Sequence, residues 1–164
     1  MSVFLFDLPI LPKDFRFPDS YTGLVRNGEL PDIKPWEFLA GDMGRSLSYY
    51  GSMLERYKQL PLIPFAIIAD RTGFHNDGYV TLALFDGSDV HGEPRVRIFD
   101  YATPKKSPWD NIAYQNFEAW LEAAKAESAD HKSECADADA TDQVFGSSSA
   151  QVIAATRVFM VTHY

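Results

Sequence analysis

The chain has 164 residues, of which 46% are hydrophobic and 23% are charged, and its formal net charge is −8. This length and composition are typical of a single soluble globular domain, so we expect one domain over residues 1–164. The negative charge disfavours direct binding to nucleic acids, because their phosphate backbones repel an acidic surface. The charge serves solubility, and it also suits a basic protein partner.

Cys135 is the only cysteine, so no internal disulfide is expected and nothing requires an oxidising compartment. The first residues, MSVFLFDLPILPK, are apolar, but they lack a basic region and are interrupted by Asp7 and two prolines. This pattern does not fit a signal peptide. No run approaches the roughly 18 apolar residues of a membrane-spanning helix. We therefore expect a cytoplasmic protein that does not associate with membranes.

Residues 18–26 predict a short first helix. Pro18 suits the first helical turn, and the pair Asn27 and Gly28 can adopt the left-handed conformation that ends a helix. Residues 31–45 contain two prolines and two glycines, and they predict a loop. The expected anchors of this loop are Trp36 and Phe38.

Residues 46–58 predict a second helix, with Ser46 as its N-cap. Apolar residues recur there every three or four positions, which places them on one helical face. This predicted apolar face consists of Leu47, Tyr50, Leu54 and Tyr57.

The next part of the chain predicts three β-strands, at residues 62–70, 79–87 and 95–102. The segments between them, RTGFHNDG and SDVHGEP, are rich in the Asn, Asp and Gly residues that turns require. Parallel pairing would need a crossover of about a dozen or more residues, and these connections are too short. We therefore expect an antiparallel meander.

Residues 111–126 predict an amphipathic helix, with Asp110 as the expected N-cap. At about 100° per residue, its apolar side chains share one arc of roughly 120°. These residues are Ala113, Tyr114, Phe117, Trp120, Leu121 and Ala124. An amphipathic helix packed on a sheet explains the whole arc. We therefore interpret the arc as part of the core and not as the lining of a site.

Residues 127–149 are small, acidic and rich in serine, which predicts a mobile connector. Residues 150–164 are apolar again, so they are expected to dock on the domain. Their β-branched and alanine content leaves a strand and a helix as open alternatives.

The sequence contains no motif of a known catalytic or cofactor site. His131 and Cys135 supply only two potential metal ligands, and the aspartates of DADATD lack the glycine and the last glutamate of a calcium loop. Arg95 and Arg97 lie on one side of a predicted strand. They either bind an anion or, as we favour, pair with nearby acids on the wet face of the sheet. We expect no catalytic residue, no metal and no cofactor.

Three short motifs follow one another along the chain: a Pro-x-x-Tyr helix that ends in Asn-Gly, a PFA strand, and a last helix with Phe-x-x-Trp-Leu. The residues that form them are Pro18, Tyr21, Asn27 and Gly28, then Pro64, Phe65 and Ala66, and then Phe117, Trp120 and Leu121. In this order and spacing the motifs resemble the SUKH superfamily, over residues 15–125. That group includes bacterial immunity proteins and the Smi/Knr-type regulators of fungal cell-wall synthesis. The resemblance implies an α+β fold with a curved, mainly antiparallel sheet packed by helices, and it implies no catalytic residues.

The resemblance also implies a non-enzymatic protein-binding function, namely an immunity protein that neutralises a cognate bacterial toxin by binding and occluding it. An intracellular adaptor or regulator of the Smi/Knr type is the alternative, and a small enzyme with an unrecognised site is a third possibility. A basic toxin would be attracted by acids on rigid turns and on the helix exterior. The candidate partner-binding residues are Asp77, Asp86, Asp89, Glu93, Glu118 and Glu122.

Overall fold

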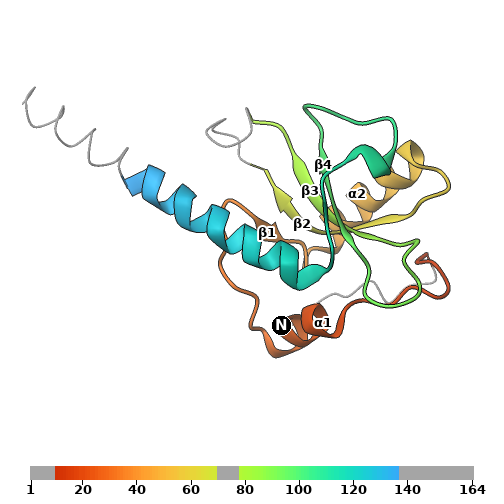
Figure 1. Cartoon of the computed structure of the whole chain (residues 1–164), viewed down its shortest axis with the longest axis horizontal. Coiled ribbons are helices and arrows are strands. Elements are labelled where there is room, and N and C mark those ends of the chain that lie inside the picture. The colour runs from red at the N-terminus through yellow and green to blue at the C-terminus, as the bar shows by residue number, and fades with distance from the viewer. Residues whose placement is uncertain (1–9, 70–77, 137–164) are drawn as a thin grey trace, which may run out of the picture. The chain divides into compact units, whose positions relative to one another are not determined.

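The computed structural model describes residues 10–69 and 78–136. In chain order its elements are α1 (Asp19–Asn27), β1 (Glu37–Phe38), α2 (Met43–Arg56), β2 (Leu62–Ile68), β3 (Thr81–Asp86), β4 (Val96–Asp100), the 3₁₀ helix η1 (Pro108–Asp110) and β5 (Ala113–Tyr114) (Figure 1). A last helix begins at residue 117 and continues through residue 136. The chain divides into a unit of residues 1–128 and a unit of residues 129–164, and the account below concerns the first unless stated otherwise.

The five strands form one open sheet in the order β1-β2-β3-β4-β5, and every neighbouring pair is antiparallel. The predicted meander of 62–70, 79–87 and 95–102 is therefore confirmed, and so is the α+β class. The two edge strands, β1 and β5, are only two residues long. All seven residues of β2 are buried, because both faces of the sheet are covered.

One face of the sheet carries an aromatic cluster around Phe65. The Phe65 ring stacks on Phe85, with 4.2 Å between centroids, and meets Trp120 edge-on at 4.8 Å. Tyr21 of α1 and Phe117 of the last helix each lie 5.7 Å from the Phe65 ring. Edge-on and offset contacts of this kind are the favoured geometries of aromatic pairs. Phe117 is 0% exposed and Trp120 is 1% exposed, which confirms that the last helix closes a core.

Trp36 joins the segment before β1 to the last helix. Its Nε1 donates a hydrogen bond to Glu127 Oε2 at 2.6 Å, and its ring meets Trp120 edge-on at 5.6 Å. Phe38 meets the same Trp120 ring at 5.9 Å. The predicted anchoring role of Trp36 and Phe38 is therefore confirmed. The predicted loop of residues 31–45 is wrong in part, because it contains β1, which pairs with β2.

The opposite face of the sheet carries a second buried cluster, and Figure 1 shows α2 on the side of the sheet opposite the helix that begins at residue 117. α2 contributes Met53 to this cluster, and Tyr57, at its C-cap, joins it. The Tyr57 ring meets the Phe99 ring at 6.2 Å, and the Arg56 guanidinium lies 5.0 Å from that ring. The buried members are Leu39, Met53, Tyr57, Leu62, Ile67, Leu82, Leu84 and Phe99.

α1 agrees with its predicted bounds to within one residue at each end. It ends at Gly28, which has a φ of 70° and is the C-cap. The Gly28 N–H donates to Val25 O, and the following Glu29 N–H donates to Leu24 O. A residue without a Cβ adopts this left-handed conformation at low cost, which is why the chain turns here.

The predicted start of α2 is wrong. The helix begins at Met43, and its N-cap is Asp42, whose carboxylate accepts the backbone N–H of Arg45 at 2.9 Å. Ser46 is buried, and its hydroxyl donates to Leu39 O instead of capping the helix. A carboxylate near a helix N-terminus satisfies an unpaired N–H and interacts favourably with the helix dipole, so Asp42 supplies the stronger cap.

The predicted apolar face of α2 is only half right. Tyr50 and Tyr57 are buried, but Leu47 and Leu54 are exposed, and Met53 is fully buried in their place. The buried positions follow one another at spacings of three and four, as one helical face requires.

The predicted helix of residues 111–126 also needs correction. Its first part is not helical, because Ala113 and Tyr114 form β5 and pair with Arg97 and Val96 of β4. The helix begins at residue 117, and its cap is Asn116, not Asp110. The Asn116 Oδ1 accepts the Ala119 N–H at 2.9 Å.

The predicted connector of residues 127–149 is wrong in its first part, since residues 127–136 are helical. Its remainder, 137–149, and the segment 150–164 lie outside the described residues.

Candidate functional site

A buried ion pair joins the ends of two neighbouring strands. Asp86 closes β3, and Arg97 lies in β4, in register with Leu84, so both side chains lie on the sheet face that carries the second cluster. Arg97 Nε donates to Asp86 Oδ2 at 3.2 Å. Asp86 is 2% exposed and Arg97 is 4% exposed.

The second carboxylate oxygen of Asp86 is also satisfied. Its Oδ1 accepts the backbone N–H of Ser88 at 3.1 Å and the Ser88 hydroxyl. Buried charges are tolerated when they are paired and their remaining lone pairs are hydrogen-bonded, and Asp86 meets both conditions. The pair therefore holds the guanidinium of Arg97 in a fixed position.

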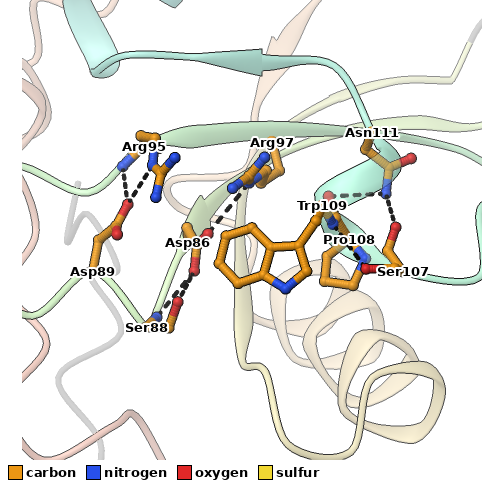
Figure 2. A network of polar contacts seen from close by, with 9 residues as sticks. All are labelled: Asp86, Ser88, Asp89, Arg95, Arg97, Ser107, Pro108, Trp109 and Asn111. Atoms are coloured by element: carbon orange, nitrogen blue, oxygen red, sulfur yellow. Dashed lines mark hydrogen bonds and ion pairs between the residues drawn. The ribbon is translucent and has the colours of Figure 1, made fainter.

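Trp109 lies over this fixed guanidinium (Figure 2). The Arg97 Cζ lies 4.5 Å from the centroid of the Trp109 ring, which is a cation–π contact. The backbone of Trp109 is held in η1, where its N–H donates to Ser107 Oγ at 3.2 Å. The amide of Asn111 donates to the carbonyl oxygens of Ser107 and Pro108, at 3.4 and 3.5 Å. Although its ring contacts Arg97 and its backbone is hydrogen-bonded in η1, Trp109 remains 47% exposed.

A second ion pair lies beside the first and is open to solvent. Asp89 Oδ2 accepts the backbone N–H of Arg95 at 2.9 Å and the Arg95 Nε at 3.2 Å. The Arg95 Cζ lies 5.8 Å from the centroid of Trp109. Burial would raise the pKa of Asp89, but the two hydrogen bonds from Arg95 outweigh it and hold that pKa below its usual value. The expected pairing of Arg95 and Arg97 with nearby acids is confirmed, but a wet environment for Arg97 is wrong.

We define the Trp109 surface as Trp109, Asp89 and Arg95. This surface combines an exposed indole with a partly exposed ion pair. Residues of these types dominate the binding energy of many protein interfaces.

The six predicted acids do not form one surface. Asp86 is buried against Arg97, so its expected place on the exterior is wrong. The physical reason is that the neighbouring strand presents a guanidinium directly to it. Asp89 is on the Trp109 surface but is paired with Arg95. Asp77 lies outside the described residues.

The remaining three acids are exposed, as predicted. Glu93 lies in the connection between β3 and β4, and Glu118 and Glu122 lie on the outer side of the last helix. Glu122 forms a surface ion pair with Lys125 at 2.8 Å. Sequence reasoning did not identify Trp109 as a functional residue, because the partners of its ring, Arg95 and Arg97, belong to a different segment of the chain.

The described part of the chain offers no evident metal centre. In residues 10–69 and 78–136, no three His, Cys, Asp or Glu side chains gather as potential ligands. His131 and Cys135, in the second unit, lie on one helical face with 3.8 Å between Nε2 and Sγ. The expectation of no metal stays a prediction. No helix in the described ranges has both the length and the apolar character that crossing a membrane requires.

Comparisons of the chain with protein-family models, with curated proteins and with solved structures found no match. The resemblance to the SUKH superfamily therefore stays a prediction that rests on the three motifs. The structure explains what the motif residues do physically. Tyr21, Phe65, Phe117 and Trp120 pack together in the first aromatic cluster, and Gly28 ends α1.

Proposed function

We propose that this protein is a non-enzymatic protein-binding domain, and specifically an immunity protein that binds a cognate bacterial toxin and occludes its active site. The observation that supports binding is the exposed Trp109 ring held over the buried Arg97 guanidinium. Tryptophan is enriched among the few residues that dominate interface energies. A ring that is fixed before the partner arrives loses little conformational freedom on binding.

The chemistry of the partner follows from charge. The chain carries a formal net charge of −8, and three of the predicted acids are exposed: Glu93 between β3 and β4, and Glu118 and Glu122 on the last helix. Toxins that act on nucleic acids are basic because their substrate is anionic, so an acidic protein would attract them at long range. The toxin itself is inferred from the resemblance to the SUKH superfamily.

An adaptor of the Smi/Knr type would use the acidic connector predicted for residues 127–149 as its docking segment. Residues 127–136 are helical, which removes part of that basis. The Trp109 surface fits a toxin and other protein partners alike, so the experiment is chosen to distinguish these partners.

The decisive test is rescue of bacterial growth. The chain is co-expressed with the product of a neighbouring gene that arrests growth, and binding is measured with the two purified proteins. We expect rescue by the unaltered chain, and we expect Trp109→Ala to weaken binding by at least about 2 kcal/mol. Met43→Ala, at the start of α2, removes a side chain that is 49% exposed and lies outside both candidate sites, so it is the matched control and should rescue fully. Rescue by Trp109→Ala with unchanged affinity would exclude the Trp109 surface as the docking site.

Charge reversal tests the electrostatic part separately. Glu93→Lys and Glu118→Lys together should slow association and reduce its dependence on ionic strength, while the dissociation rate changes little. The measurement is stopped-flow association with the purified toxin at several salt concentrations. An unchanged association rate would leave binding in place but would contradict electrostatic attraction.

A further inference from the structure

A pocket of about 380 Å³ lies at the end of the sheet remote from the Asp86–Arg97 pair. Asp86 closes β3, whereas the pocket lies before its first residue, where the Tyr101 N–H donates to Val80 O at 3.0 Å. We call it the tyrosine pocket. Its lining residues are Ser48, Tyr49 and Ser52 of α2, Gly78, Tyr79 and Val80 before β3, and Tyr101 after β4.

The walls of the tyrosine pocket are aromatic and carry hydroxyl groups. The rings of Tyr49 and Tyr101 are tilted toward each other, with 6.3 Å between centroids. The hydroxyls of Ser52 and Tyr101 are hydrogen-bonded at 2.8 Å. Tyr79 is 52% exposed, so its ring at the rim of the pocket is accessible to a ligand. Burial, and then the neighbouring Tyr101, raise the pKa of Tyr49, which keeps its hydroxyl protonated as a donor.

Among the residues that the structure describes, the lining contains no Asp, Glu, Lys or Arg side chain, which favours an uncharged occupant. A cation site would need a carboxylate, or an aromatic cage without a positive charge near it. Instead, the positive charge of Arg45, one helical turn before Tyr49, acts on the Tyr49 hydroxyl. A small cation is therefore disfavoured. The lining suits flat or ring-shaped apolar groups that also offer hydrogen-bond acceptors.

We propose that the tyrosine pocket binds an uncharged, proline-rich peptide segment of a partner protein in the polyproline II conformation. Proline rings pack against aromatic faces, and the carbonyl oxygens of an extended segment accept hydrogen bonds from the hydroxyls of Tyr and Ser. Proline has no N–H, so its backbone brings no donor that the pocket would leave unpaired. The volume is within the usual range of ligand pockets, and the half-exposed ring of Tyr79 is accessible to a peptide. This inference does not depend on the toxin proposal.

The test is a titration of isotopically labelled protein with hexaproline blocked at both ends, followed by amide chemical shifts. We expect the largest shifts at Ser52, Val80 and Tyr101, and weaker or no response to blocked hexaglycine. Tyr79→Ala removes a ring that is half in solvent, so it should fold normally and weaken hexaproline binding by roughly 2–10-fold. Tyr79→Phe retains the ring and should bind within about 2-fold of the unaltered chain.

Trp109→Ala serves as the positional control and should leave hexaproline binding unchanged. Absence of shifts at the pocket at millimolar hexaproline would overturn the proposal, as would equal binding of hexaglycine. The proposal also fails if tetramethylammonium shifts these amides and hexaproline does not, since the pocket would then be a cation site. An unchanged affinity of Tyr79→Ala would likewise contradict it.

Discussion

The two faces of the sheet differ in what holds them together. The first face is an aromatic core of Tyr21, Phe65, Phe85, Phe117 and Trp120, sealed from solvent. The second face is a mainly aliphatic core with a buried ion pair at one end and the tyrosine pocket at the other. The residues that stand out in the sequence lie on the first face, where they stabilise the fold. Both candidate binding sites lie toward the ends of the second face and are assembled from residues far apart in sequence.

The two tryptophans, Trp120 and Trp109, give the sharpest test of this comparison. Trp120→Ala should lower the free energy of unfolding by about 3–5 kcal/mol, because it leaves a large cavity between four aromatic rings. Trp109→Ala should cost only about 0.5–1 kcal/mol, since the ring is half exposed and its removal loses mainly the cation–π contacts with Arg95 and Arg97. Urea denaturation of both variants measures the difference. Equal losses of stability would mean that Trp109 is a core residue and not a binding residue.

The Asp86–Arg97 pair tests whether the second face depends on charge. Asp86→Ala should lower stability by about 3 kcal/mol, because it leaves the Arg97 charge buried without its partner. The double variant Asp86→Leu with Arg97→Met should recover most of that loss, since it removes both charges together. Thermal and urea unfolding of the single and double variants provide the measurement. A double variant as unstable as Asp86→Ala would show that the geometry of the pair, and not the stranded charge, supports this end of the sheet.

Gly87 tests how tightly the end of β3 is packed. A Cβ at Gly87 would lie 2.5 Å from the Pro61 carbonyl oxygen and 3.1 Å from Ile63 Cδ1. The Gly87 N–H also donates to that same Pro61 oxygen at 2.8 Å, so the backbone cannot retreat without losing the hydrogen bond. We expect Gly87→Ala to cost about 1–3 kcal/mol in unfolding free energy. The control Gly51→Ala has open space around the new methyl group and should not destabilise the helix.

Asp89 gives the smallest expected effect, and it depends on pH. Because the folded-state pKa of Asp89 is lowered, its stabilising contribution is complete above the unfolded-state pKa and is lost as pH falls through the folded-state pKa. The pair with Arg95 is partly exposed, so we expect less than about 1 kcal/mol. The stability gap between the unaltered chain and Asp89→Asn should be constant above about pH 5 and should close in more acidic solution. A gap that widens toward low pH would contradict the assigned sign.

Periodicity and turn chemistry predicted most of the fold. The strands 62–70, 79–87 and 95–102 alternate with turn residues, and local patterns of that kind are readable without tertiary contacts. The short edge strands were missed, because two residues such as Glu37 and Phe38 give no periodic signal. The same limit explains Ala113 and Tyr114, whose pairing with β4 overrides a helical pattern.

The candidate sites were less predictable than the fold. Asp86 is a turn aspartate by sequence, and only the register of β3 against β4 brings it to Arg97. Trp109 could not be distinguished from a core tryptophan, since exposure depends on the packing of η1. The tyrosine pocket is lined by residues of α2 and by residues next to β3 and β4. Because these segments are far apart in sequence, no local motif predicts the pocket.

The two-residue edge strands limit how this protein can associate with others. A partner that adds a strand to a sheet relies on a row of free backbone N–H and C=O groups along an edge. β1 and β5 pair at only two positions each, so the edges they form offer very few such groups. The sheet is thereby protected from edge-to-edge aggregation. Recognition through these edges is disfavoured, so specificity depends on side chains, and single substitutions on the surface should be able to change it.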